Sequence, residues 1–418
     1  MQRTLPGDRG RVQHGPPAPE PGLPVLPEIA AVLAAAASRT VSEPAGGGAA
    51  IRTAASGHWL RRGLRADPDD IVAGPGAPSL LFALMAAAGG DVLLPRPCPA
   101  WWAPQVRLLG DGRSAFHVPT PAECGGVPDP YALMETVRRV RAEGGEPRLL
   151  LLSVPDDPTA TVAPPEVVHQ VCEVALAEGL YVVSDETWRD TVHRTVAAET
   201  QDGRPSRRPV FLSPAEMFPD QVVVLTDLAG TLTPTSWPAA IARLPGTGYG
   251  AALRARALDV LAALGATVPA PVVEAAAYAL SDPEPVVARA EAAAALHARV
   301  QGAVHRAVLA AGALSRPPAA GRHLYVDLDP LRDGLAARGV TDSMELEDHL
   351  TERLGTPVPG GHRFGDPLGA LRVRLSTAPL LGATPQQRME SLTAQEPLEL
   401  PHVEQMLNEL GAALTELG

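Results

Sequence analysis

The sequence predicts an α/β fold in which a large domain with a mostly parallel sheet between helices is followed by a smaller α+β domain. Short apolar segments alternate with helical segments through the first two thirds of the chain, an order typical of βαβ units. The apolar run RLLLLSV (Arg148–Val154) predicts a strand that is covered on both faces. A chain of 418 residues is long enough for two domains, which invite a ligand cleft between them.

The individual elements follow from apolar spacing and from proline and glycine positions. A helical pattern covers Leu26–Ser38, a flexible glycine loop is expected at Ala45–Ala50, and another helix continues through His58–Leu64. Further strands are expected at 71–74, 91–95 and 180–186, helices at 78–90 and 164–179, and one long helix over about 284–311. We expect residues 1–23 to be a disordered Pro/Gly-rich tail, 24–55 to join the small domain, 56–283 to form the large domain, and 284–418 to form the interdomain helix and small domain.

Composition and charge exclude several classes of protein. A net charge of -12 disfavours nucleic-acid binding, because phosphates would be repelled. The three cysteines and the histidines have no ligand spacing, so neither a metal site nor a disulfide framework is expected. The sequence contains no membrane-length apolar run and no apolar signal core at its start, so we expect no membrane partner and a cytoplasmic location.

The chain contains no lysine, because all 35 of its basic residues are arginine. A Schiff base with a carbonyl cofactor requires a primary amine on a side chain. No side chain of this sequence can therefore form that bond.

Six segments, in order and at consistent spacing, resemble motifs of the class I/II aminotransferases, which are fold-type-I enzymes that use pyridoxal 5'-phosphate (PLP). They are IVAGPGAPSLL, DVLLPRPCPAWW, SVPDDPTATV, SDETW, LTDLAGTLTPTSWPAAI and RVRLSTA, and the resemblance runs from about Ala45 to Gly418. It implies a fold-type-I PLP-transferase-like architecture, PLP as the cofactor, an amino or keto acid as the ligand, and a homodimer.

Some site residues of the family have counterparts here. The resemblance places Asp185 at the pyridine nitrogen, which a carboxylate keeps protonated, and Gly76 and Ala77 at the phosphate, where backbone N–H groups at a helix start can bind it. Arg374 matches the arginine that holds the substrate carboxylate by two parallel hydrogen bonds. Each also has a purely structural interpretation: Asp185 as a turn cap, and Arg374 as the partner of a carboxylate within the protein.

Other positions of the motifs have changed. The Schiff-base lysine falls on Gly230, the phosphate-binding serine on Asp227, and the phosphate-binding arginine on Pro238. We interpret Asp227 as a solvated or loop-capping aspartate, although its carboxylate could also face the phosphate position. The remaining changes concern the cofactor ring: the NPTG asparagine is Asp157, the DExY tyrosine is Trp188, and the stacking aromatic falls on Pro99, with Trp101 or Trp102 nearby as a replacement or as core filler.

These changes predict an aminotransferase-like protein without the usual lysine mechanism, and with poor retention of PLP. The first hypothesis is a catalytically degenerate binding or regulatory protein that keeps an amino-acid or keto-acid pocket around Arg374. A second is an enzyme that holds PLP or pyridoxamine phosphate (PMP) noncovalently through Asp185 and the Gly76 turn. A third is a noncatalytic dimer partner of an active paralogue that supplies the lysine.

Overall fold

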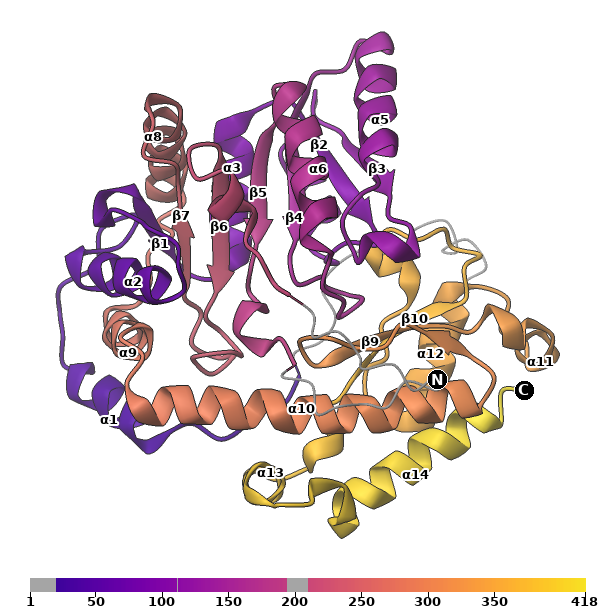
Figure 1. The fold of residues 1–418 in the computed structure, drawn as a ribbon. Coiled ribbons are helices and arrows are strands. Elements are labelled where there is room, and N and C mark those ends of the chain that lie inside the picture. Colours follow the sequence, from indigo (N-terminus) through magenta and orange to yellow (C-terminus); the bar gives the residue numbers. More distant parts are fainter. Residues whose placement is uncertain (1–19, 111, 194–209) are drawn as a thin grey trace, which may run out of the picture.

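The computed structural model describes residues 20–110, 112–193 and 210–418. The large domain contains a seven-stranded sheet with strand order β1-β7-β6-β5-β4-β2-β3 (Figure 1). Strands β2 to β6 pair in parallel, whereas β7 is antiparallel to both β6 and β1. The bounds are β1 (Ile71–Gly74), β2 (Asp91–Arg96), β3 (Ala115–Pro119), β4 (Pro147–Ser153), β5 (Tyr181–Asp185), β6 (Val222–Asp227) and β7 (Ala240–Arg243). The predicted mostly parallel α/β sheet is confirmed.

Helices cover both faces of this sheet and bury its apolar side chains in two separate clusters. On one face, the cluster includes residues from α2 (Ala49–Arg61), α5 (Pro130–Ala142), α6 (Pro165–Ala177) and α9 (Ala270–Leu280). On the other face, it includes residues from α3 (Ala77–Ala88), α4 (Trp102–Leu108) and α8 (Gly248–Ala263). Because both faces are covered, the central strands are continuously apolar, as in the buried run of β4.

The smaller domain is built on a three-stranded antiparallel sheet in the order β10-β9-β8. Its core consists of side chains from this sheet and from the surrounding helices, with α10 connecting it to the large domain beneath the larger sheet (Figure 1). The bounds are α10 (Glu284–Ala310), β8 (Leu314–Ser315), β9 (His323–Asp327), α11 (Arg332–Ala337), α12 (Ser343–Leu354), β10 (Arg372–Ser376), α13 (Pro385–Thr393) and α14 (Pro401–Thr415). The short helix α7 (Pro214–Met217) precedes β6.

The N-terminal segments differ in detail from the sequence-based expectation. The glycine loop expected at Ala45–Ala50 ends at Gly48, where α2 starts, and Gly46 accepts a 2.8 Å hydrogen bond from the amide of Ala73. Helix α1 (Pro27–Ala36) packs against α9 and the start of α10. Most of the tail predicted over residues 1–23 lies outside the described residues, but residues 20–23 pack against the rest of the protein. Within the described part of the chain, no helix has the length and apolarity needed to cross a bilayer.

Candidate functional site

Three carboxylates lie at the carboxyl ends of adjacent parallel strands, where ligands commonly bind in open α/β sheets. Asp185 is the last residue of β5, Asp227 is the last residue of β6, and Asp157 follows β4. They are close enough that the charges of Asp227 and Asp157 both contribute to raising the pKa of Asp185. The edge of the sheet that the resemblance assigns to a cofactor is therefore rich in acidic groups.

Asp227 occupies the amino end of helix α3. Its Oδ2 accepts a 3.0 Å hydrogen bond from the amide of Ala77, and its Oδ1 accepts a 2.9 Å hydrogen bond from the amide of Ala229. Burial raises the pKa of this carboxyl to about 6, although hydrogen bonds from the backbone act in the opposite direction. Asp227 caps its own loop, as expected, and is partly buried. It also provides the anion at a helix N-terminus.

Asp227 and Pro238 both lie beside the turn that precedes α3. Gly76 precedes the helix with a φ of +91°, a backbone conformation that favours glycine. A Cβ atom built on Gly76 would lie 3.8 Å from Oδ2 of Asp227 and 3.8 Å from Cβ of Pro238. Two residues that differ from the family motifs therefore meet at the position expected for the phosphate. Pro78, in the first turn of the helix, has no N–H to offer a further anion.

Asp185 is bound to its own turn. Its Oδ1 accepts hydrogen bonds from the amide of Thr187 at 3.0 Å and from the hydroxyl of Thr187 at 2.6 Å. The residue is 7% exposed, and burial raises its pKa to about 7 despite these two bonds. The turn-cap interpretation of Asp185 thus describes its contacts in this structure, and an unpaired charge on it is disfavoured at neutral pH.

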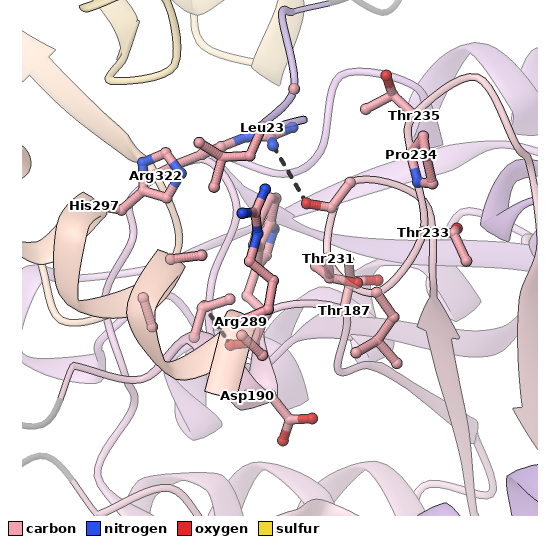
Figure 2. Close-up of a pocket in the computed structure, with 18 of the residues that line it drawn as sticks. Leu23, Thr187, Asp190, Thr231, Thr233, Pro234, Thr235, Arg289, His297 and Arg322 are labelled. Atoms are coloured by element: carbon pink, nitrogen blue, oxygen red, sulfur yellow. Dashed lines mark hydrogen bonds between the residues drawn. The ribbon is translucent and has the colours of Figure 1, made fainter. Parts of the chain in front are cut away.

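The position assigned to the lysine is conformationally unsuited to a side chain. Gly230 has a φ of +86°, where an L side chain is strained, and a Cβ there would lie 3.2 Å from Cγ2 of Thr235. It would also lie 3.4 Å from Nη2 of Arg322, whose Nη1 is 3.5 Å from the carbonyl oxygen of Gly230 (dashed line in Figure 2). A guanidinium from another part of the chain is therefore placed beside this loop.

Arg374 is retained and buried, and its partners are carboxylates of the protein. Its Nη1 donates to Oδ1 of Asp157 at 3.0 Å, and its Nη2 lies 3.6 Å from Oε1 of Glu20. The guanidinium also lies over the ring of Phe364, 5.0 Å from the centroid. Its Nε has no hydrogen-bond partner among the described residues. The pairing of Arg374 within the protein is therefore present, and its role in binding a ligand carboxylate stays a prediction.

Glu20 is a site residue that the sequence did not suggest. Its carboxylate accepts a 2.8 Å hydrogen bond from the hydroxyl of Ser376 and lies 3.3 Å from Nε2 of His323 and 3.3 Å from Nε of Arg322. Burial alone would raise the pKa of Glu20, but His323, Arg322 and Arg374 together hold it well below its usual range. Glu20 is therefore an ionised carboxylate that is held by basic groups of the small domain.

The tryptophans have different surroundings. Arg322 lies over the indole of Trp188, 5.4 Å from the ring centroid, and His323 packs edge-on against the same indole at 5.5 Å. Trp102 is 1% exposed within the apolar cluster of α3 and α4, and Trp101 packs edge-on against it. Trp188 thus lies beside Arg322 and His323, whereas Trp102 packs within the apolar core of the large domain.

A cavity of about 130 Å³ opens beside these groups, between the 230–235 loop, helix α10 and the N-terminal segment 21–26. Figure 2 shows Thr231 and Thr187 on one side of it, and Arg322, His297 and Leu23 around the other. Burial and the charge of Arg322 lower the pKa of His297 to about 3, so this imidazole is neutral at physiological pH. The cavity lining thus combines apolar side chains with threonine hydroxyls and charged groups such as Arg322.

The residues present do not fit PLP. A phosphate at the start of α3 would compete with Asp227 for the amide of Ala77, and its charge would face that carboxylate. Pro238 supplies no cation there, and the chain has no lysine for a covalent bond. Each missing charge-assisted hydrogen bond forfeits about 1.5–3 kcal/mol, to which like-charge repulsion adds.

The sequence matches the model of a known protein family. The aminotransferase class I and II family model matches residues 23–380, and the chain belongs to that family. Members of this family use PLP. The mostly parallel large sheet and the smaller antiparallel one agree with this assignment, and the fold-type-I prediction is confirmed.

Individual relatives are aminotransferases. The chain is 28% identical to a probable aspartate/prephenate aminotransferase of Thermus aquaticus over 208 residues, which is 49% of each protein. It is 31% identical to a bifunctional aspartate aminotransferase and glutamate/aspartate-prephenate aminotransferase of Petunia hybrida over 158 residues, 36% of this chain and 31% of that one. The matches thus span about half the length of these curated relatives or less.

Solved structures agree on the fold. Aspartate aminotransferase from Thermus thermophilus with maleate superposes with a TM-score of 0.72 at 20% identity, covering 96% of this chain and 90% of that one. N-succinyldiaminopimelate aminotransferase from Mycobacterium tuberculosis gives 0.70 at 21% identity, covering 96% and 92%. At this identity the likeness establishes the fold alone.

Proposed function

We propose that this protein is a catalytically degenerate member of the aminotransferase family that binds an amino or keto acid through its carboxylate, without PLP chemistry. The observation that carries the proposal is the carboxylate of Asp227, which receives the Ala77 amide at the start of α3. Gly230 adds to it, because its backbone conformation disfavours any side chain. Together they support the loss of both means by which the family holds its cofactor.

The ligand class follows from the retained arginine. Arg374 is buried, lies on strand β10 and carries a planar donor fork, which suits bidentate binding of a carboxylate. Arg322 provides a second guanidinium within the same pocket. In this account the protein acts as a binding or regulatory module, in a homodimer as in the family as a whole.

The proposal is tested by adding carboxylic acids to the PLP-free protein and following its melting temperature. Pyruvate and L-alanine are expected to raise the midpoint in a saturable manner, because a ligand that binds only the folded state stabilises it. No transamination should accompany the shift. The same acids are added to Glu20→Gln, which lacks the protein's own carboxylate in the pocket. If amino and keto acids leave the melting temperature of both proteins unchanged, the proposed binding of these acids is wrong.

The two other hypotheses remain open but have less support. Noncovalent use of PLP or PMP requires a phosphate to displace Asp227 and an ionised Asp185, whose pKa burial raises to about 7. A partner paralogue that supplies a lysine would meet a Gly230 loop already bordered by the guanidinium of Arg322. Turnover by the purified protein with added cofactor would favour noncovalent use of PLP or PMP. Co-purification with a lysine-bearing relative would favour the paralogue partner.

A further inference from the structure

The carboxylate of Glu20 lies between two arginines, in a pocket built by the small domain. Arg322 and His323 stand at the start of β9, while Arg374 and Ser376 lie on β10. These strands are hydrogen-bonded neighbours, with Ser376 opposite His323 in the register. Arg374 and Ser376 are two residues apart, so their side chains project from the same face of the strand. The donors are therefore held together by a rigid sheet.

Glu20 reaches this pocket from the other end of the sequence. It is 356 residues away from Ser376, whose hydroxyl it binds at 2.8 Å. Its oxygens also lie within 3.6 Å of the side-chain nitrogens of Arg322, His323 and Arg374. Both carboxylate oxygens of Glu20 are thus directed at donors, which is the arrangement that a bound carboxylic acid would adopt.

The charge balance of the pocket depends on this residue. Arg322 and Arg374 contribute two positive charges, and Asp157 and Glu20 contribute two negative charges. Without the Glu20 carboxylate, Asp157 is left as the carboxylate that pairs with Arg374, and Arg322 loses its ion-pair partner. An uncompensated buried guanidinium is energetically costly. Binding of another carboxylate in the place of the Glu20 carboxylate would remove that cost.

The residues that follow Glu20 cover the cavity. Residues 21–26 form part of its lining, and Leu23 packs against the core of the small domain. The carbonyl oxygen of Pro24 accepts a 2.5 Å hydrogen bond from Arg289 on α10. Arg322 belongs both to the cavity lining and to the pocket that holds Glu20, so the two spaces adjoin at this side chain.

We propose that Glu20 is an internal ligand of the pocket formed by Arg322, His323, Arg374 and Ser376, and that a small amino or keto acid binds by displacing it. This rests on the proposed carboxylate-binding function and adds the groups that hold the carboxylate and the competitor that controls access. The protein therefore responds to its ligand only at concentrations that overcome an intramolecular carboxylate. The bound form differs from the unbound form in the position of the N-terminal segment.

The test compares pyruvate binding by the natural protein, Glu20→Gln and Glu28→Gln, using tryptophan fluorescence and the melting temperature. Glu28 is a matched control, because it is exposed in the first turn of nearby α1. Glutamine at position 20 keeps the size of the side chain and removes its charge. Pyruvate is expected to bind Glu20→Gln at least about tenfold more tightly, because the competing form is depopulated. Glu28→Gln should bind it with the affinity of the natural protein.

The possible outcomes separate this proposal from the function on which it rests. Equal pyruvate affinity of the natural protein and Glu20→Gln, with binding present in both, overturns the internal-ligand proposal and leaves the carboxylate function intact. Absence of binding in all three proteins overturns the carboxylate function and displacement together. A further outcome is that Glu20→Gln, but not Glu28→Gln, melts at a lower temperature than the natural protein and that saturating pyruvate restores its melting temperature. This outcome supports the proposal independently of the measured affinities.

Discussion

Replacement of Arg374 by methionine is expected to lower the free energy of unfolding by about 3–5 kcal/mol, the range measured when one partner of a buried ion pair is removed. The guanidinium is 7% exposed and lies between Asp157 and Glu20. Methionine fills much of the volume but leaves the Asp157 carboxylate without its 3.0 Å hydrogen bond. The measurement is the unfolding midpoint in urea, followed by circular dichroism.

The matched control is Arg353→Met, which breaks a two-bond pair with Glu416 on the surface. These side chains are 41% and 58% exposed, so solvent screens the pair and its loss should lower the free energy of unfolding far less than the loss of Arg374. Similar losses in the two variants would contradict the account, because they would mean that Arg374 is solvated like a surface residue. The methionine variant should also lose the stabilisation by pyruvate, whereas Arg353→Met should keep it.

Replacement of Asp185 by asparagine is expected to stabilise the protein above neutral pH. Burial raises the pKa of Asp185 from an ordinary value of 3.8 to about 7, so the folded state retains a proton that the unfolded state has lost between these values. Stability contributed by this group is therefore present at low pH and declines as the pH rises through that window. At about 1.4 kcal/mol per pH unit, the decline is on the order of 4 kcal/mol.

Asparagine keeps an oxygen that can accept both hydrogen bonds from Thr187. The substitution therefore removes the ionisable group and preserves the local structure. The difference in unfolding free energy between Asp185→Asn and the natural protein should grow from pH 4 to pH 7 and then level off. Asp227→Asn provides a comparison, because the pKa of that carboxyl is raised to about 6 and its difference should level off earlier. A difference for Asp185→Asn that is constant with pH would show that this carboxyl is solvated.

Much of the fold followed from the sequence, because apolar runs and periodic helices report burial locally. The long helix expected over about 284–311 is α10, Glu284–Ala310, and the run from Arg148 is β4. The segment before Leu26 was harder, because prolines and glycines without apolar periodicity indicate a tail. The ion pairs of Glu20 are made with residues more than 300 positions away, for which the local sequence carries no signal.

The sequence indicated which residues lie in the candidate site, but it did not indicate which partners these residues contact. The resemblance gave the residues at each strand end, yet the partner of Asp227 is 150 residues distant, and the conformation of Gly230 is a property of its folded loop. Arg322 was missed because it lies outside the motifs, just before an unremarkable strand. The only sequence signal for it was the absence of lysine, which leaves arginine as the residue that can bring a permanent cation to the loop.

PLP binding shows whether the protein's own carboxylate, Asp227, fills the position of the cofactor's phosphate. Purified protein is titrated with PLP and PMP, following cofactor absorbance together with the fluorescence of the five tryptophans, among which Trp188 lies in the site. Asp227→Ser is titrated in parallel, because serine frees the Ala77 amide and removes the opposing charge. We expect no saturable binding to the natural protein up to millimolar cofactor, and a measurable gain in Asp227→Ser. Saturable micromolar binding to the natural protein, weakened by Asp185→Asn, would contradict it and restore the enzyme hypothesis.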